Sequence, residues 1–268
     1  MKQLSSSVSD PLWMSVGTLT ALPVPAPGTT DARVAGRAML LAPLAALPLA
    51  VLACGVVAVA ALIDLPPLVS AAIAVAAVGL SSRGLHLDGL ADTADGLGRA
   101  GRSGPLGGSY DRARALEIMR KGDVGPMGVA TLVLVLLAQV AALSGAIAAG
   151  HGVFAAAAAV LVSRLVLAGC CAQGVPAARK EGLGGTVAGS VRRWQAAAAL
   201  AVGAVLVSLG ALAADLTWWR GAIAALVGIA GAAVLLARCV QRLGGITGDV
   251  LGGCVEAAAL GVLLSLAA

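Results

Sequence analysis

Three aspartates lie on one short segment of the chain, where Asp88 is followed by Asp92 and then by Asp95. Spacings of four and three residues place all three carboxylates on one face of an α-helix. Like charges at such spacings repel one another, and a hard divalent cation turns that repulsion into coordination. Carboxylate-bound Mg²⁺ is the usual partner of phosphate substrates. The spacing therefore predicts a Mg²⁺ site for phosphate chemistry, and the alternative is a solvated acidic face on a loop.

Polar residues on either side of this segment extend the candidate site. His86 is expected to precede the helix and to lie off its aspartate face, where a role as ligand or base competes with local hydrogen bonding. Downstream, guanidinium and ammonium groups that match phosphate oxygens alternate with acids, and the residues concerned are Arg112, Glu117, Arg120, Lys121 and Asp123. The competing interpretation of this stretch is an amphipathic helix with salt bridges along its surface.

Three further features lie later in the chain. Arg179 and Glu181 stand in a short polar segment, and the glycine-rich segment 243–253 contains Thr247 and Asp249. Glycines let the backbone approach a ligand and expose N–H groups at a helix start, which suits phosphate. Glycines repeated every four residues also suit tight helix packing. Arg164 falls inside an apolar stretch, so we expect it either to pair within the protein or to contact substrate.

The composition shows what kind of scaffold must position these groups. Hydrophobic residues make up 59% of the 268 residues and charged residues only 12%, and the mean hydropathy is +0.97. A soluble domain carries about twice that share of charge, and a disordered chain needs low hydrophobicity. Aromatic residues, at 2%, are too few for the aromatic girdles of an outer-membrane barrel. The remaining class is a helical membrane protein.

Seven apolar stretches are long enough for membrane helices, because a span needs about 20 residues. They cover 38–63, 66–82, 126–149, 152–174, 195–214, 219–237 and 250–268. This predicts an all-α, polytopic helical bundle with about seven transmembrane helices, in one domain over residues 1–268 and surrounded by a lipid bilayer. Residues 8–24 are mildly apolar and are expected along the membrane interface. The five cysteines are expected to be small buried core residues.

The distribution of charge predicts the orientation. With a cytoplasmic N-terminus, 16 of the 18 basic residues fall on the cytoplasmic side, while Arg220 lies outside and Arg164 within a span. This agrees with the positive-inside rule. It predicts a multi-pass protein of the cell membrane whose active site faces the cytoplasm. The net charge of +5 is then explained by topology, so no nucleic-acid partner is expected. The chemistry predicted from these residues is metal-dependent phosphoryl or phosphodiester transfer to a hydrophobic or membrane-held acceptor.

The segment from His86 to Gly96 resembles the signature of the cobalamin synthase family, the adenosylcobinamide-GDP ribazoletransferases. Further segments resemble the family's other motifs in the same order, so the resemblance covers essentially the whole chain; they are 18–25, 115–120 with 124–125, 163–164, 178–184 and 244–252. The resemblance implies an integral-membrane enzyme that uses Mg²⁺. Such an enzyme joins adenosylcobinamide-GDP to α-ribazole or its 5′-phosphate, releasing GMP and forming adenosylcobalamin or its 5′-phosphate. A homo-oligomer is compatible with this assignment.

Carried over to this sequence, the resemblance makes Asp88, Asp92 and Asp95 the metal and diphosphate residues. Together with the chemistry argued above, it adds His86 and Glu117 to the catalytic group. Substrate and phosphate binding is assigned to the other candidates, which are Arg112, Arg120, Asp123, Arg164, Arg179, Glu181, Thr247 and Asp249. The sequence departs from the family where Lys121 replaces an acid, a role that Asp123 would take over. The insertion from Gly98 to Ser109 is also longer than the family's.

Two other functions are compatible with parts of the sequence. The run from Asp92 to Gly96 is partly similar to the motif of CDP-alcohol phosphotransferases, but the later aspartates of that motif are missing. A small-molecule transporter is the non-enzyme alternative. Transporters place ionisable residues near the membrane midplane between broken helices, and Arg164 is the one residue clearly predicted there.

Overall fold

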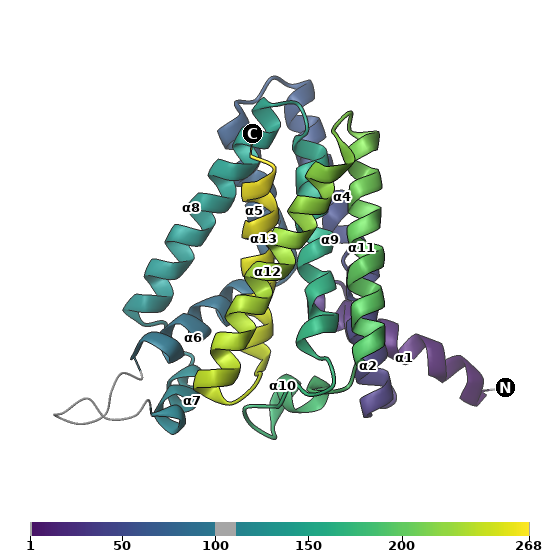
Figure 1. Cartoon of the computed structure of the whole chain (residues 1–268), viewed down its shortest axis with the longest axis vertical. Coiled ribbons are helices and arrows are strands. Elements are labelled where there is room, and N and C mark those ends of the chain that lie inside the picture. Colours follow the sequence, from purple (N-terminus) through teal and green to yellow (C-terminus); the bar gives the residue numbers. More distant parts are fainter. Residues whose placement is uncertain (1, 100–110, 268) are drawn as a thin grey trace.

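The computed structural model describes residues 2–99 and 111–267, so most of the 98–109 insertion lies outside the described residues. Within them the fold is helical, with two isolated bridges that join Ala172 to Val191 and Ala177 to Ile246. Figure 1 shows the arrangement of the elements. The helices are α1 (Lys2–Leu19), α2 (Ala32–Leu40), α3 (Ala42–Ala45), α4 (Leu47–Leu62), α5 (Pro67–Ser81), α6 (Leu85–Arg99), α7 (Arg112–Lys121), α8 (Pro126–Ala148), α9 (Gly152–Cys170), α10 (Gly182–Val187), α11 (Arg193–Ala213), α12 (Trp218–Leu243) and α13 (Gly248–Ser265).

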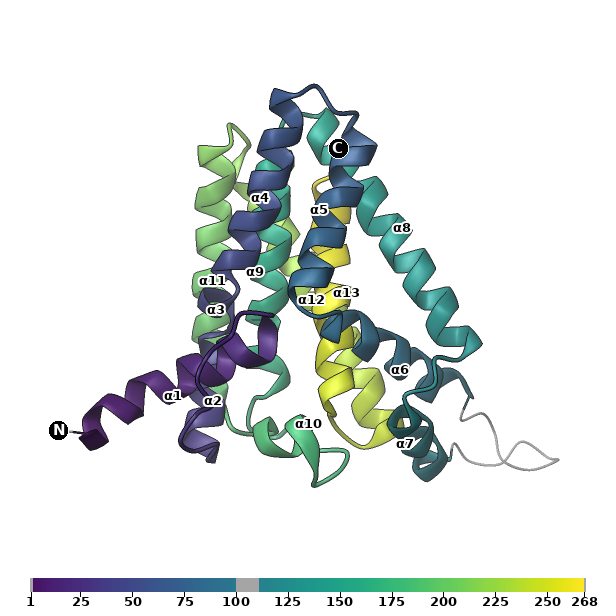
Figure 2. The ribbon, with the colours of Figure 1, turned by 180° about the vertical axis from the view of Figure 1, so that it is seen from behind.

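The predicted apolar stretches form upright helices that stand side by side, namely α4, α5, α8, α9, α11, α12 and α13 (Figures 1 and 2). Among the described residues, five helices are long and apolar enough to cross a membrane, and the bent pair of α5 and α6 raises the number to six. The all-α bundle is therefore confirmed. The predicted count of seven is not reached by helix length and composition, because α4 has only 16 residues.

The first predicted stretch, 38–63, is broken into three helices. Pro43 lies in the first turn of α3 and Pro48 in the first turn of α4. Proline has no backbone N–H to donate and is tolerated in a first turn, where that donor would be unpaired in any case. Each proline therefore begins a new helix, which leaves α4 shorter than the apolar stretch that contains it.

The turn between α5 and α6 changes the direction of the chain by 88°. Arg83 and Gly84 both adopt left-handed backbone angles, with φ of 57° and 67°. Such angles end a helix, and glycine adopts them at no steric cost. The Arg83 guanidinium also donates a hydrogen bond of 2.6 Å to the Gly17 carbonyl at the end of α1. As a result α6 runs across one end of the bundle (Figure 2) and lies outside the upright helices.

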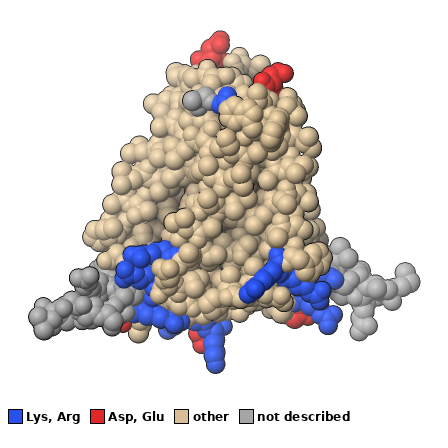
Figure 3. All heavy atoms as spheres, viewed as in Figure 1, with Lys and Arg blue, Asp and Glu red and all other residues tan. Residues whose placement is uncertain are grey.

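The same end of the bundle carries α2, α7 and α10, and we call it the basic end because Lys and Arg gather there (Figure 3). Helix α1 lies across the bundle near this end, as expected for a segment along a membrane interface. The opposite end carries the turn at Asp64 between α4 and α5 and the turn at Asp215 between α11 and α12. Lys and Arg are thus concentrated at one end of the bundle, as the sequence predicts.

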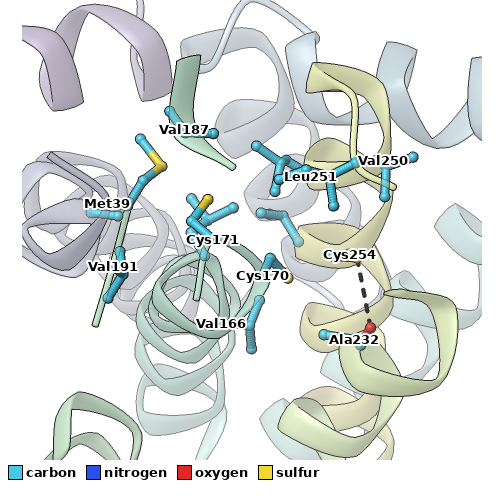
Figure 4. Close-up of a cluster of buried hydrophobic side chains, with 14 of the residues drawn as sticks. Met39, Val166, Cys170, Cys171, Val187, Val191, Ala232, Val250, Leu251 and Cys254 are labelled. Atoms are coloured by element: carbon cyan, nitrogen blue, oxygen red, sulfur yellow. Dashed lines mark hydrogen bonds between the residues drawn. The ribbon is translucent and has the colours of Figure 1, made fainter. Parts of the chain in front are cut away.

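A cluster of buried hydrophobic side chains inside the bundle, next to the basic end, fixes the position of the start of α13. Figure 4 shows Met39 of α2, Cys170 of α9, Val191 and the α13 residues Val250 and Leu251 packed together. Four of the cysteines are buried, which confirms their predicted role in the core; they are Cys170, Cys171, Cys239 and Cys254, whereas Cys54 is half-buried. Because α2, α9 and α13 share this cluster, the first turn of α13 is held rigidly at the basic end.

Candidate active site

Helices α6 and α13 cross at close range at the basic end. A Cβ atom on Gly89 of α6 would lie 2.6 Å from the Asp249 carbonyl oxygen, and one on Gly252 of α13 would lie 3.1 Å from the His86 Cα atom. Only glycine allows backbones to approach this closely. For Gly252 this confirms the packing interpretation of the glycine-rich segment. The crossing also brings the aspartates of α6 next to the first turn of α13.

Three carboxylates meet at this crossing and form the acidic cluster of Asp88, Asp92 and Asp249. Asp88 is exposed, whereas Asp92 is only 5% exposed. Burial first, and then the charges of Asp88, Asp249 and Asp95, raise the pKa of Asp92 to about 6 against the opposing effect of Arg179. A carboxylate that is buried among other acids is stabilised by a bound cation. The helical spacing thus correctly predicted two members of the cluster, and the third comes from another helix.

Asp95 is buried and, unlike Asp88, does not lie on an exposed face of α6. It is 1% exposed, and its Oδ2 atom accepts a hydrogen bond from the Gly125 N–H that precedes α8. Its Oδ1 atom is buried and has no hydrogen-bond partner among the residues that the structure describes. A negative charge is favourable at a helix N-terminus. Helical periodicity places the three aspartates at similar angles around α6, but α8 packs over the second half of α6 and covers Asp95.

Arg179 brings a positive charge to the acidic cluster. Its Nη2 atom lies 3.3 Å from Asp249 Oδ2, and both side chains are about one-fifth exposed. The same Asp249 oxygen accepts a hydrogen bond of 3.1 Å from the Thr247 hydroxyl, which in turn accepts from the Val250 N–H and caps α13. The predicted residues Thr247, Asp249 and Arg179 therefore form one connected group.

The backbone around Arg179 is fixed from two sides. The Ala178 N–H donates to the Ile246 carbonyl at 2.9 Å, and the Arg112 guanidinium donates to the Ala178 carbonyl at 3.0 Å. Gly184 packs against the segment before α13, since a Cβ atom there would lie 2.6 Å from the Thr247 Cα atom. Arg112, predicted to bind phosphate, here holds the loop that carries Arg179.

His86 lies inside α6, in its first turn, and not before the helix as predicted. The turn at Gly84 starts the helix earlier than the sequence pattern indicates. His86 is 3% exposed, and burial together with the charge of Arg164 holds its pKa well below the usual range. Its Nδ1 atom lies 3.4 Å from Arg164 Nη2. Because arginine only donates, the neutral imidazole accepts there. Its buried Nε2 atom has no hydrogen-bond partner within the described part of the chain.

The remaining candidates of α7 and α10 lie on the surface of the basic end. Glu117 is exposed and pairs with Lys121 at 2.9 Å, and the hydrogen bond from Lys121 lowers the pKa of Glu117. This is the salt-bridged helix surface that was the competing interpretation of the segment. Arg120, Asp123 and Glu181 are also exposed.

Comparison with known proteins identifies the family. The profile of the family described as "Cobalamin-5-phosphate synthase" matches residues 11–267. The chain belongs to this family. Among its relatives, proteins named adenosylcobinamide-GDP ribazoletransferase are 43% identical in Nocardioides sp. (over 95% of this chain and 96% of the relative), 42% in Frankia casuarinae (93% and 91%) and 36% in Pseudomonas savastanoi (96% and 98%). No solved structure matches the chain. These findings favour the cobalamin synthase hypothesis over the CDP-alcohol phosphotransferase and transporter alternatives.

The fit of a metal ion to this cobalamin synthase family member depends on the acidic cluster. Within residues 2–99 and 111–267, no group of three or more His, Cys, Asp or Glu side chains is arranged to hold a metal by itself. Mg²⁺ is usually bound by one or two carboxylates together with substrate phosphates and water. Asp88 and Asp92, with Asp249 beside them, meet that requirement.

Sequence reasoning missed a second polar group inside the bundle. Gln139 of α8 donates a hydrogen bond of 2.8 Å to Glu256 Oε2 of α13, and the charge of Glu256 interacts with that of Arg164. All three side chains are at most 9% exposed. The signal was available in the sequence, because an acid within an apolar span is rare and usually functional.

Proposed function

We propose that this chain is an adenosylcobinamide-GDP ribazoletransferase that joins adenosylcobinamide-GDP to α-ribazole or its 5′-phosphate. The single observation that carries the proposal is the acidic cluster of Asp88, Asp92 and Asp249 with Arg179 beside it, in a member of a family whose relatives are named for this reaction. Acids that hold a divalent cation and a base that contacts phosphate are what transfer from a nucleoside diphosphate needs.

The reaction replaces the phosphoanhydride bond of the diphosphate by a phosphodiester bond. A ribosyl hydroxyl oxygen of α-ribazole bonds to the phosphorus nearest the cobinamide, the bond from that phosphorus to the oxygen of GMP breaks, and the hydroxyl proton passes to solvent. Negative charge grows on the leaving GMP phosphate. The Arg179 guanidinium offsets this charge.

Mg²⁺ is part of the proposal. Asp88 and Asp92 would hold the ion, with Asp249 as the third acid of the cluster, and a bound Mg²⁺ neutralises charge on the diphosphate. Asp95 is proposed to support the site from behind, because its carboxylate is already bonded at the start of α8. His86 and Arg164 support α6 from the bundle side.

We also propose the predicted orientation, in which the protein lies in the cell membrane with its N-terminus and its basic end toward the cytoplasm. The gathering of Lys and Arg at that end (Figure 3) supports it through the positive-inside rule. In this topology α4 and α5 cross the membrane together with the five longer helices, because they stand upright beside them (Figure 2). The chain then acts as one catalytic domain.

The proposed function is tested by following both products. Purified protein in lipid nanodiscs is given adenosylcobinamide-GDP and Mg²⁺, with or without α-ribazole, and GMP and the corrinoid product are measured by chromatography. We expect GMP to appear in equal amount to adenosylcobalamin, only when α-ribazole is present, and to stop when EDTA removes the metal. Absence of both products in the complete mixture would contradict the proposed activity. Full activity in EDTA would contradict the Mg²⁺ requirement alone.

A further inference from the structure

A cavity lies among α4, α5, α8, α9 and α13, and Leu87 of α6 lines one end of it. Most of its lining is alanine, valine and leucine. The polar side chains that line it are Gln139, Arg164 and Glu256. A mostly apolar cavity with a few convergent polar groups is typical of a small-molecule binding site.

One polar group in this cavity is unpaired. The Arg164 side chain is 2% exposed, and its two terminal nitrogens contact the Ser163 hydroxyl at 2.9 Å and His86 at 3.4 Å. Its Nε atom is buried and has no hydrogen-bond partner among the described residues. A buried donor without an acceptor is costly, so a ligand with a matching acceptor is favoured there.

Charge restricts the ligand to a neutral molecule. Arg164 and Glu256 carry opposite charges, and Gln139 already donates to Glu256. A phosphate would add an unpaired negative charge to an apolar space, which is strongly unfavourable. Guanine would bring several donors and acceptors that alanine and leucine walls cannot satisfy. The ligand that fits is a compact, apolar, heteroaromatic ring with one acceptor nitrogen.

We infer that this cavity binds the heteroaromatic base of the acceptor nucleoside α-ribazole, with the ring nitrogen accepting a hydrogen bond from Arg164 Nε–H. The inference rests on the proposed function and deepens it. The base of α-ribazole is a benzimidazole, whose fused rings are apolar and which keeps one free ring nitrogen after attachment to the ribose. Of the parts of the two substrates, the corrinoid macrocycle is too large for the cavity and the diphosphate is charged.

The cavity lies on the bundle side of α6, and the acidic cluster lies where α6 meets the start of α13. Leu87 lines the cavity, and its neighbour Asp88 belongs to the acidic cluster. An α-helix with its side chains is about 10 Å across, so the α6 end of the cavity and the acidic cluster are separated by about one helix width at most. A base held beneath α6 places the attached ribose, which carries the attacking hydroxyl, toward the phosphates at Asp88 and Asp92.

Filling the cavity provides the first test. Ala159 of α9 lines the cavity and is 6% exposed, whereas Ala141 of α8 faces outward. Ala159→Leu should raise the KM for α-ribazole at least about tenfold, because each additional carbon in a fitted apolar pocket changes discrimination by about that factor. The KM for adenosylcobinamide-GDP should stay within about twofold. Ala141→Leu, the matched control, should leave both constants unchanged.

Direct binding provides the second test and also covers a variant that inserts poorly. The probe is 5,6-dimethylbenzimidazole, titrated by its own fluorescence into wild-type protein in nanodiscs. Saturable binding that is weakened at least about tenfold by Arg164→Lys, which keeps the charge but removes Nε–H, supports the inference. If wild-type protein forms adenosylcobalamin while Ala159→Leu keeps the normal KM for α-ribazole, the base site is wrong and the proposed function stands. If wild-type protein binds the probe but transfers nothing, the proposed function is wrong.

Discussion

Replacing Asp92 by asparagine should stabilise the metal-free protein at neutral pH. The Asp92 carboxyl is 5% exposed and its pKa is raised from 3.8 to about 6 by burial and by Asp88 and Asp249. The folded state therefore holds the proton more tightly than the unfolded state. As the pH rises from about 4 to about 6, the unfolded chain releases this proton first, and the free energy of unfolding of the wild type falls. Asparagine has no proton to lose and avoids this cost.

The size of the effect follows from the shift in pKa. Each unit is worth about 1.4 kcal/mol, so the whole shift corresponds to roughly 3 kcal/mol. Asp88 is exposed, and water there screens its charge, which reduces the expected gain to about 1–2 kcal/mol. For a chain of this length that gain raises Tm by about 3–6 °C.

The assay is thermal unfolding in EDTA at several pH values between 4 and 7, followed by tryptophan fluorescence. Asp92→Asn should unfold at a higher temperature than the wild type at pH 7, and the two curves should converge near pH 4. Asp215→Asn, at the opposite end of the bundle and exposed, removes the same charge and should not change the pH dependence. A wild-type Tm that is flat from pH 4 to 7, or a loss of stability in Asp92→Asn, would refute the reasoning.

Three other substitutions test the packing around the site. Gly89→Ala should destabilise the protein by about 1–3 kcal/mol and slow transfer about tenfold or more, because its Cβ atom meets the Asp249 carbonyl oxygen at 2.6 Å. Gly55→Ala, where the space is open, is the control, and equal behaviour of the two variants would contradict the close crossing. Arg112→Ala should destabilise the protein by about 1 kcal/mol and raise the KM for adenosylcobinamide-GDP, because it loses the hydrogen bond to the Ala178 carbonyl just before Arg179. An unchanged Tm would show that this hydrogen bond contributes nothing to stability. Asp95→Ala should lower the stability of the protein by about 1–2 kcal/mol. Asp95→Asn keeps an acceptor for the N–H at the start of α8 and should remain close to wild type in thermal unfolding, so equal losses in both variants would contradict the capping role.

Periodicity and hydropathy predicted the helices but not all of their neighbours. The apolar stretches and the helical spacing of Asp88 and Asp92 are local properties, and both are found in the structure. Periodicity gives only the angle of a side chain around its own helix, so it could not show that α8 covers Asp95. Nor could it show that Asp249, more than 150 residues away, completes the acidic cluster.

Two local signals in the sequence were passed over. Arg83 and Gly84 form a left-handed turn that starts α6 before His86, and a glycine after an apolar helix is a usual sign of such a turn. Glu256 was absorbed into an apolar window, because averaging hydropathy over a whole span hides one acid. Its partner Gln139 lies on another helix, so their contact required the fold.

The central claim is that the acidic cluster at the crossing of α6 and α13 is where GMP is released. The most direct measurement is the initial rate of GMP release from adenosylcobinamide-GDP with α-ribazole and Mg²⁺, for Asp88→Ala and Asp92→Ala beside the wild type, with insertion and Tm checked for each. We predict that both variants fold and that both lose GMP release by a factor of about 10²–10³ or more. Folded variants that both keep a rate within about tenfold of the wild type would contradict the claim.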